Sequence, residues 1–142
     1  MKETHEFWMK KAIVAAQESK TPYGAIIVNS KGEFIEAFNT VKTDGPIAHA
    51  EINVIQKLKK MQAEKKEELI LYSTVEPCPM CMSAIIWAGI GTIIYGADIP
   101  FAAKYGNQIN IRANEIINNS WRNTILIQGV LAKECEILFT IK

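Results

Sequence analysis

Short apolar segments alternate with helical segments along this chain, and this alternation restricts the possible folds more than any other feature of the sequence. A first helix is expected near the N-terminus, because apolar residues such as Trp8 and Ala12 recur at helical spacing. Strands that alternate with helices predict an α/β domain, with a largely parallel or mixed five-stranded sheet and helices on both faces. The expected strands are 25–29, 33–38, 69–75, 92–96 and 124–128, and the expected helices are 3–19, 48–62, 80–88, 99–105, 113–119 and 131–139.

The length and composition fit a single globular domain. The chain has 142 residues, the size of one ordinary domain, so residues 1–142 are assigned to one unit. Apolar residues make up 49% and charged residues 22%, which excludes a disordered chain, a collagen and a coiled-coil rod. The formal net charge is +1, whereas a strongly basic balance would have indicated a nucleic-acid partner.

The sequence also predicts a cellular compartment. No apolar run approaches the roughly 20 residues of a membrane helix, and residues 1–6 lack the apolar stretch of a signal peptide. We therefore expect a cytoplasmic protein with no membrane partner. In that reducing compartment the three cysteines, Cys78, Cys81 and Cys135, indicate metal or redox chemistry rather than a disulfide framework.

Two short motifs carry the candidate chemistry, and each opens a predicted helix. The first is His49-Ala50-Glu51, and the second is Pro77-Cys78-Pro79-Met80-Cys81. Two thiols three positions apart at a helix start can turn toward one point, and the positive end of the helix dipole favours their thiolate forms. Thiolates bind Zn²⁺ well, and imidazole is the natural third ligand.

The number of candidate ligands indicates the kind of zinc site. His49, Cys78 and Cys81 make three, whereas a structural zinc site normally has four protein ligands and a catalytic one keeps a position for water. A catalytic zinc ion lowers the pKa of its water to near neutrality. Glu51, two residues from His49, is the candidate general acid and base that would move that proton.

Other interpretations of these residues remain open at this point. An isolated Cys-x-x-Cys motif also occurs as a redox pair or as two core thiols. A structural zinc site would need a fourth ligand, and Cys135 is the candidate, although its apolar neighbours on the last expected helix favour a buried thiol. His5 is interpreted as a polar residue on the first helix.

His-x-Glu followed by Pro-Cys-x-x-Cys is the signature of zinc deaminases. With it, nearly the whole chain resembles the cytidine/deoxycytidylate deaminase superfamily, and most closely the branch that holds guanine deaminase and bacterial tRNA adenosine deaminase. Residues 5–9 and 129–135 resemble the tRNA enzyme, whereas Pro79-Met80 and Trp87 look more like guanine deaminase. Segments shared by both enzymes are 22–25, 46–51 and 76–78.

This resemblance implies a three-layer fold and a set of roles at the metal. His49, Cys78 and Cys81 would hold one Zn²⁺ per chain. Glu51 would carry protons from water to the substrate ring nitrogen and then to the departing amine, which leaves as ammonia. The resemblance also implies a homodimer.

The resemblance further implies three substrate contacts, each with an alternative interpretation. Asn39 matches the asparagine that hydrogen-bonds the base, but it also suits a turn at the end of a strand. Tyr23 matches a pocket-wall position that could stack on the ring, and Trp87 is a second aromatic candidate. Core packing is the alternative for both rings, because aromatic side chains bury well anywhere.

Three functions are compatible with these features. The favoured one is hydrolytic deamination of a free nucleobase or nucleoside, with a purine preferred. The alternative is deamination of the wobble adenosine in tRNA. The third is a zinc-stabilised binding protein without turnover, which requires the fourth ligand Cys135.

The C-terminal part of the chain bears on this choice. Residues 98–142 contain five basic and four acidic residues, a balance that does not favour gripping tRNA through its phosphates. Residues 97–120 match neither enzyme closely, although they are expected to shape the substrate pocket. Asp98, Phe101 and Tyr105 are the candidates there for facing it.

Overall fold

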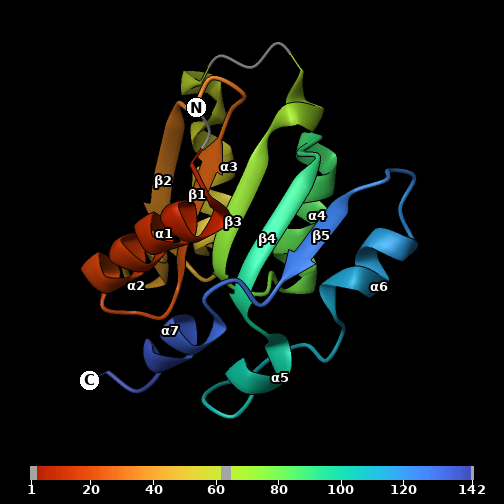
Figure 1. Ribbon diagram of the computed structural model, residues 1–142. Coiled ribbons are helices and arrows are strands. Elements are labelled where there is room, and N and C mark those ends of the chain that lie inside the picture. Colours follow the sequence, from red (N-terminus) through yellow and green to blue (C-terminus); the bar gives the residue numbers. More distant parts are fainter. Residues whose placement is uncertain (1–2, 62–64, 142) are drawn as a thin grey trace.

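The computed structural model describes residues 3–61 and 65–141, and a five-stranded mixed sheet forms its centre (Figure 1). The strands lie in the order β2-β1-β3-β4-β5. β1 runs antiparallel to both of its neighbours, and β3, β4 and β5 are parallel, which confirms the expected mixed sheet. The bounds are β1 Gly24–Val28, β2 Phe34–Phe38, β3 Ile70–Val75, β4 Thr92–Ala97 and β5 Ile125–Gln128.

Helices cover both faces of the sheet and complete three layers. In Figure 1, α1 lies in front of the sheet and α3 and α4 lie behind it. α7 packs against β4 on the same face as α1. The bounds are α1 His5–Ser19, α2 Val41–Asp44, α3 Ala50–Gln56, α4 Pro79–Ala88, α5 Ile99–Ala102, α6 Ala113–Asn118 and α7 Ala132–Ile137, with 3₁₀ helices Lys57–Lys60 and Lys66–Glu68.

Strand β1 contributes side chains to two hydrophobic cores, one on each face of the sheet. Ala25 and Ile27 pack in the core beneath α3 and α4, whereas Ile26 and Val28 pack beneath α1. All five residues of this strand are buried. A strand covered on both faces needs apolar side chains at every position, which is why this segment is continuously apolar rather than alternating.

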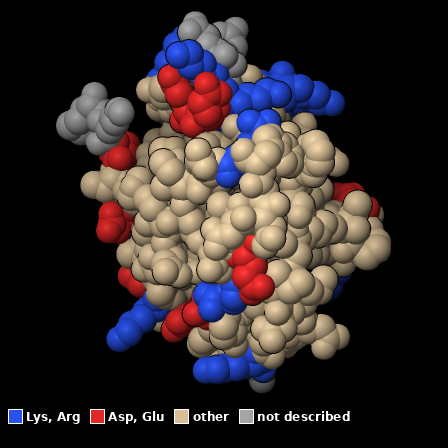
Figure 2. Space-filling view, turned by 90° about the vertical axis from the view of Figure 1, so that its right-hand side faces the viewer, with Lys and Arg blue, Asp and Glu red and all other residues tan. Residues whose placement is uncertain are grey.

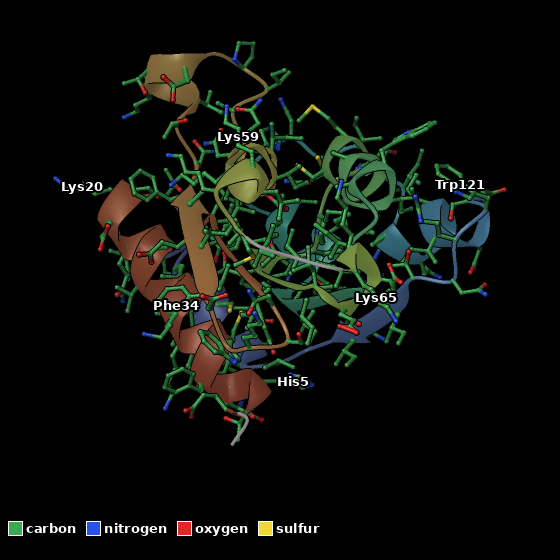
Figure 3. The ribbon with its side chains drawn as sticks, turned by 90° about the horizontal axis from the view of Figure 1, so that it is seen from above. His5, Lys20, Phe34, Lys59, Lys65 and Trp121 are labelled. Carbon is green, nitrogen blue, oxygen red and sulfur yellow. The ribbon has the colours of Figure 1, made fainter. Side chains whose placement is uncertain are left out.

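The direction of the parallel strands fixes where a site can form. The carboxyl ends of β3 and β4 emerge at the lower edge of the sheet in Figure 1, where α4 and α5 begin. In open α/β sheets, ligands bind outside the carboxyl ends of the strands. The 3₁₀ helices lie at the opposite edge, and Figure 3 looks down on that end, where Lys59 and Lys65 are labelled.

The structure differs from several of the expected helices, and α5, expected over 99–105, ends at Ala102. α3 ends at Gln56 and continues as a 3₁₀ turn, and residue 62, the expected helix end, lies outside the described residues. α7 begins one residue later than expected, because Leu131 has the left-handed conformation with φ 52°. α2 was not expected, since four residues are too few to show a helical period. Within residues 3–61 and 65–141, no helix has the length and apolar character needed to cross a membrane.

Candidate zinc centre and its pocket

Two helix starts face each other at the carboxyl edge of the sheet and supply the candidate metal ligands. His49 occupies the N-cap position of α3, and Cys78 occupies that of α4, three residues after strand β3 ends. Cys81 follows in the first turn of α4. Pro79 occupies the first helical position, where its fixed φ suits the helix and its missing N–H costs nothing.

The three side chains converge closely enough to share one ion. Nδ1 of His49 lies 3.7 Å from Sγ of Cys78 and 3.5 Å from Sγ of Cys81. All three ligand atoms lie within 4.8 Å of one another, and no other such group of three occurs among the described residues. One imidazole and two thiols form a donor set that suits Zn²⁺.

Cys135, the candidate fourth ligand, lies elsewhere. It sits on α7 in the core on the opposite face of the sheet, packed with Trp8 and Ile94, and it is fully buried. The expectation of a buried apolar thiol is therefore correct. Without Cys135, the centre keeps three protein ligands, the number found in catalytic rather than structural zinc sites.

The pKa values of the two thiols at the centre favour binding of a cation. A hydrogen bond from Cys81 lowers the pKa of Cys78 to about 4, and His49 adds to this effect although burial opposes it. The same contact, together with burial, raises the pKa of Cys81, so the metal-free pair shares one proton. A thiolate is the form of cysteine that binds a metal ion, so a low pKa at Cys78 favours metal binding.

Glu51 lies beside this centre in the first turn of α3 and is only 5% exposed. Burial raises the pKa of Glu51 to about 7, and the negative charge of Cys78 adds to the rise. The Oγ atom of Ser73 lies 3.3 Å from Oε2 of Glu51. A carboxyl group that titrates near neutrality can both accept and release a proton, as a general acid and base must.

A pocket of about 380 Å³ opens onto the centre. Its volume falls in the range of small-molecule sites, roughly 300–1,000 Å³. Tyr23 and Asn39, two of the three expected substrate contacts, line it together with Glu51. The remaining lining residues are Pro46, His49, Val75, Glu76, Cys78, Met80, Asn107, Gln108 and Ile109.

Asn39 and Tyr23 are each held in place by the fold. Oδ1 of Asn39 accepts a hydrogen bond from the N–H of Val41. Asn39 therefore also stabilises the turn after β2, which was the alternative to a substrate contact. Among the described residues, none is hydrogen-bonded to its Nδ2 group. The ring of Phe139 packs edge-on against Tyr23, with the ring centres 5.9 Å apart, and supports that wall of the pocket.

Trp87, the third expected contact, does not line this pocket. It is 72% exposed and packs against Trp121, with ring centres 4.7 Å apart, in a separate groove between α4 and α6. Trp121 is labelled at the right-hand margin of Figure 3. Six residues separate Cys81 from Trp87, which carries the ring about 9 Å along α4 and onto another face of the helix.

The sequence did not point to the three pocket residues Asn107, Gln108 and Ile109. The candidates named in that segment have other tasks: Asp98 caps α5, and the rings of Phe101 and Tyr105 pack against Phe139. The two adjacent amide side chains were the signal available, since they stand in a segment without periodic apolar residues.

Thiol alkylation distinguishes the cysteine environments. In the folded, zinc-free protein at neutral pH, we expect iodoacetamide to modify Cys78, which lines the pocket, and to spare Cys135. Burial covers Cys135 and raises its pKa to about 12, so this thiol keeps its proton and is a poor nucleophile. Added Zn²⁺ is expected to protect Cys78. Peptide mass spectrometry measures both sites, and equal modification of Cys78 and Cys135 would contradict this description.

Comparison with known proteins identifies relatives of the whole chain. Residues 2–97 match the family model of the cytidine and deoxycytidylate deaminase zinc-binding region. The guanine deaminase of Bacillus subtilis (strain 168) is 36% identical over 137 residues, 92% of this chain and 88% of the relative. The tRNA-specific adenosine deaminase of the same strain is 32% identical over 136 residues, 92% of this chain and 83% of the relative.

A solved structure shares the fold. That of a guanine deaminase from Nitrosomonas europaea has a TM-score of 0.83 at 19% identity, and the match covers 99% of this chain and 85% of that one. The family-model range, 2–97, contains all three candidate ligands and Glu51. Residues 107–109 lie beyond it, so the family match covers the metal centre but not this wall of the pocket.

Proposed function

This chain belongs to the cytidine and deoxycytidylate deaminase family, and from that premise we propose that it deaminates a free nucleobase or nucleoside, with a purine ring preferred. The observation that carries the proposal is the buried Glu51 carboxyl beside a three-ligand metal cluster, where both open onto a pocket of small-molecule size. The similarity to a guanine deaminase, at 36% identity, supports the preference for a purine.

The chemistry follows from the positions of the residues. His49, Cys78 and Cys81 would hold Zn²⁺, which supplies an acidified water when bound. Glu51 would accept a proton from the attacking water and donate it to the ring nitrogen, and the water oxygen would bond to the carbon that bears the amine. Glu51 then transfers the second water proton to the amine. The carbon–nitrogen bond breaks, ammonia leaves, and the ring keeps the new carbonyl.

The pocket wall supports an uncharged substrate. Its polar groups outside the centre are the phenol of Tyr23, the amides of Asn39, Asn107 and Gln108, and the carboxylate of Glu76. Within the described part of the chain, no lysine or arginine lines the pocket. A phosphate group is normally bound by such cations, so the lining favours a base or nucleoside over a nucleotide.

The tRNA alternative also has an observation in its favour. The chain is 32% identical to a tRNA-specific adenosine deaminase, only a little less than to the guanine deaminase. Such a substrate would place a single wobble adenosine in the pocket and its phosphates on the surface around it. The non-catalytic zinc protein loses its main support, because Cys135 lies on the other side of the sheet from the cluster.

Ammonia release tests the proposal. Zinc-loaded protein is incubated with purine and pyrimidine bases and nucleosides, and in parallel with a tRNA stem-loop that is assayed for inosine. We expect ammonia from at least one purine base or nucleoside and no inosine in the stem-loop. Inosine in the stem-loop with no ammonia from the panel would overturn the proposal in favour of the tRNA substrate, and no product from either would overturn the deamination itself.

We also propose that the chain acts as a cytoplasmic homodimer, which rests on the family resemblance. A face with few charges supports it: Figure 2 looks onto the side that carries α6 and β5, and most of the middle of that side is uncharged. Two large apolar side chains are exposed on this side: Trp121, in the loop after α6, and Ile125, on β5. Light scattering would report twice the chain mass of 15.9 kDa.

A further inference from the structure

Glu76 is a buried carboxylate that the reaction above does not use. It stands between strand β3 and the turn that carries Cys78, and it is only 3% exposed. Its Oε1 accepts a hydrogen bond from the N–H of Ile99 and its Oε2 accepts one from the N–H of Ala113, each at 2.8 Å. Nε of Arg112 lies 2.9 and 3.0 Å from the two oxygens. The carboxylate therefore has four close contacts with N–H donors from three residues.

These contacts join two places that are distant in the sequence. Ile99 begins α5 and Ala113 begins α6, so Glu76 binds both ends of segment 99–113. The N–H of Glu76 also donates to the carbonyl of Ala97 at 2.7 Å, immediately before that segment. The same carboxylate thus ties the strand that leads to Cys78 to the segment that contains residues 107–109.

The middle of this segment has little regular structure to hold it. From residue 103 to residue 112 it forms neither helix nor strand, and Asn107 and Ile109 are exposed. Burial raises the pKa of Tyr23 and the side chain of Gln108, which lines the same pocket, opposes that rise, and Tyr105 packs on Phe139. The position of this wall therefore depends on its anchored ends and on the packing of Tyr105.

We propose that Glu76 is a positioning residue that sets substrate affinity by holding residues 107–109 against the pocket. The proposal rests on the proposed function, since it concerns the same pocket. Through its contacts with Ile99, Arg112 and Ala113, Glu76 fixes the amides of Asn107 and Gln108 where a ring substrate presents its polar edge. Glu76 lies next to the turn that carries Cys78 and also binds both ends of segment 99–113. The distance between residues 107–109 and Cys78 therefore stays constant.

Only a carboxylate satisfies these donors. It presents acceptors alone, whereas the amide of a glutamine would turn N–H groups toward the N–H of Ile99 or Ala113. A buried charge is tolerated when it is paired and hydrogen-bonded, and Arg112 provides the pairing. Nη2 of Arg112 also lies 3.3 Å from the hydroxyl of Tyr95, which keeps the guanidinium in place beside Glu76.

The experiment compares Glu76→Gln and Arg112→Ala with the control Glu115→Gln, all in the zinc-loaded chain. Glu115 lies in α6, two residues after Ala113, and its side chain accepts a hydrogen bond from the backbone N–H of Arg112 at 3.2 Å, a task that glutamine also performs. For both test variants we expect KM to rise by at least about tenfold, with a smaller change in kcat and unchanged zinc content. Hydrogen exchange over residues 99–113 is expected to accelerate. The control should stay within about twofold of the parent in KM and exchange.

The outcomes separate this inference from the proposed function. Arg112→Ala decides the matter if Glu76→Gln does not fold, because the Arg112 side chain is 34% exposed and its truncation leaves the backbone contacts of Glu76 intact. Unchanged KM in the folded variants, or equal losses in kcat and zinc, would overturn the positioning role. If the parent chain releases no ammonia from any base or nucleoside, the proposed function fails. Unchanged exchange over residues 99–113 would then overturn this inference as well, and accelerated exchange in the test variants alone would support it.

Discussion

Glu51→Gln is expected to abolish ammonia release while leaving zinc binding and folding intact. The substitution keeps the size of the side chain and removes the carboxyl group that would accept and return protons in the proposed reaction. General acid and base catalysis contributes about 10²- to 10⁴-fold, so we expect kcat to fall by at least about a hundredfold. The fold should tolerate the change, because burial already raises the pKa of Glu51 to about 7 and disfavours its charge.

The measurement pairs turnover with zinc content and thermal unfolding. Zinc at the parent stoichiometry and an unchanged unfolding temperature would show that the loss lies in proton transfer rather than in the metal centre. Glu51→Ala tests the same group without the amide. Turnover near the parent level in either variant would contradict the assignment of Glu51 as the acid and base.

Cys81→Ser is expected to remove the zinc, and with it both activity and metal-dependent stability. Cys81 is fully buried in the first turn of α4, and serine replaces its soft thiolate with a hydroxyl that binds Zn²⁺ poorly. An ion that binds only the folded state stabilises it by about 4 kcal/mol at a thousand times its Kd. The parent should therefore gain about that much in zinc over its chelated form, and the variant should gain almost nothing.

Cys135→Ser is the matched control for this prediction. It makes the same substitution at an equally buried cysteine, but on the opposite face of the sheet. We expect this variant to keep the parent zinc content and the parent gain in stability on adding zinc. Zinc loss in Cys135→Ser, or full zinc content in Cys81→Ser, would show that the three-ligand centre is wrongly assigned.

The two motifs of the candidate metal centre could be recognised in the sequence because each is local, whereas their convergence on one ion was implied by the resemblance to zinc deaminases. His49 and Glu51 are two residues apart, and Cys78 and Cys81 are three apart. Each pair lies at a helix start, where spacing alone decides which way the side chains turn. The alternation of strands and helices likewise predicted the mixed sheet, and the resemblance to the deaminase superfamily is confirmed by the family match over residues 2–97.

The pocket wall could not be predicted because it is assembled from distant parts of the chain. Residues 107–109 reach the pocket through contacts of Glu76 with Ile99 and Ala113, which span more than 20 positions in the sequence. No local period marks such contacts. Trp87 was expected at the pocket from its resemblance to guanine deaminase, but its distance along α4 carries it to the groove with Trp121.

The position of Glu76 in the sequence was one sign of its structural role. Glu76 is an acidic residue directly after the expected strand 69–75, at the end of a strand that the structure buries. Charged side chains are almost never fully buried unless they are paired, so such a position predicts a partner elsewhere in the chain. Its partner, Arg112, is 36 residues away, and only the folded structure identifies it.

Product analysis in water labelled with heavy oxygen shows whether this chain hydrolyses an amine at the candidate zinc centre. Zinc-loaded protein is incubated with the best purine substrate in labelled water, and ammonia and the labelled product are measured together. We expect one ammonia and one labelled carbonyl oxygen for each substrate consumed, and neither after zinc is removed by a chelator. Ammonia without label in the product, or equal turnover in the chelated protein, would contradict the account.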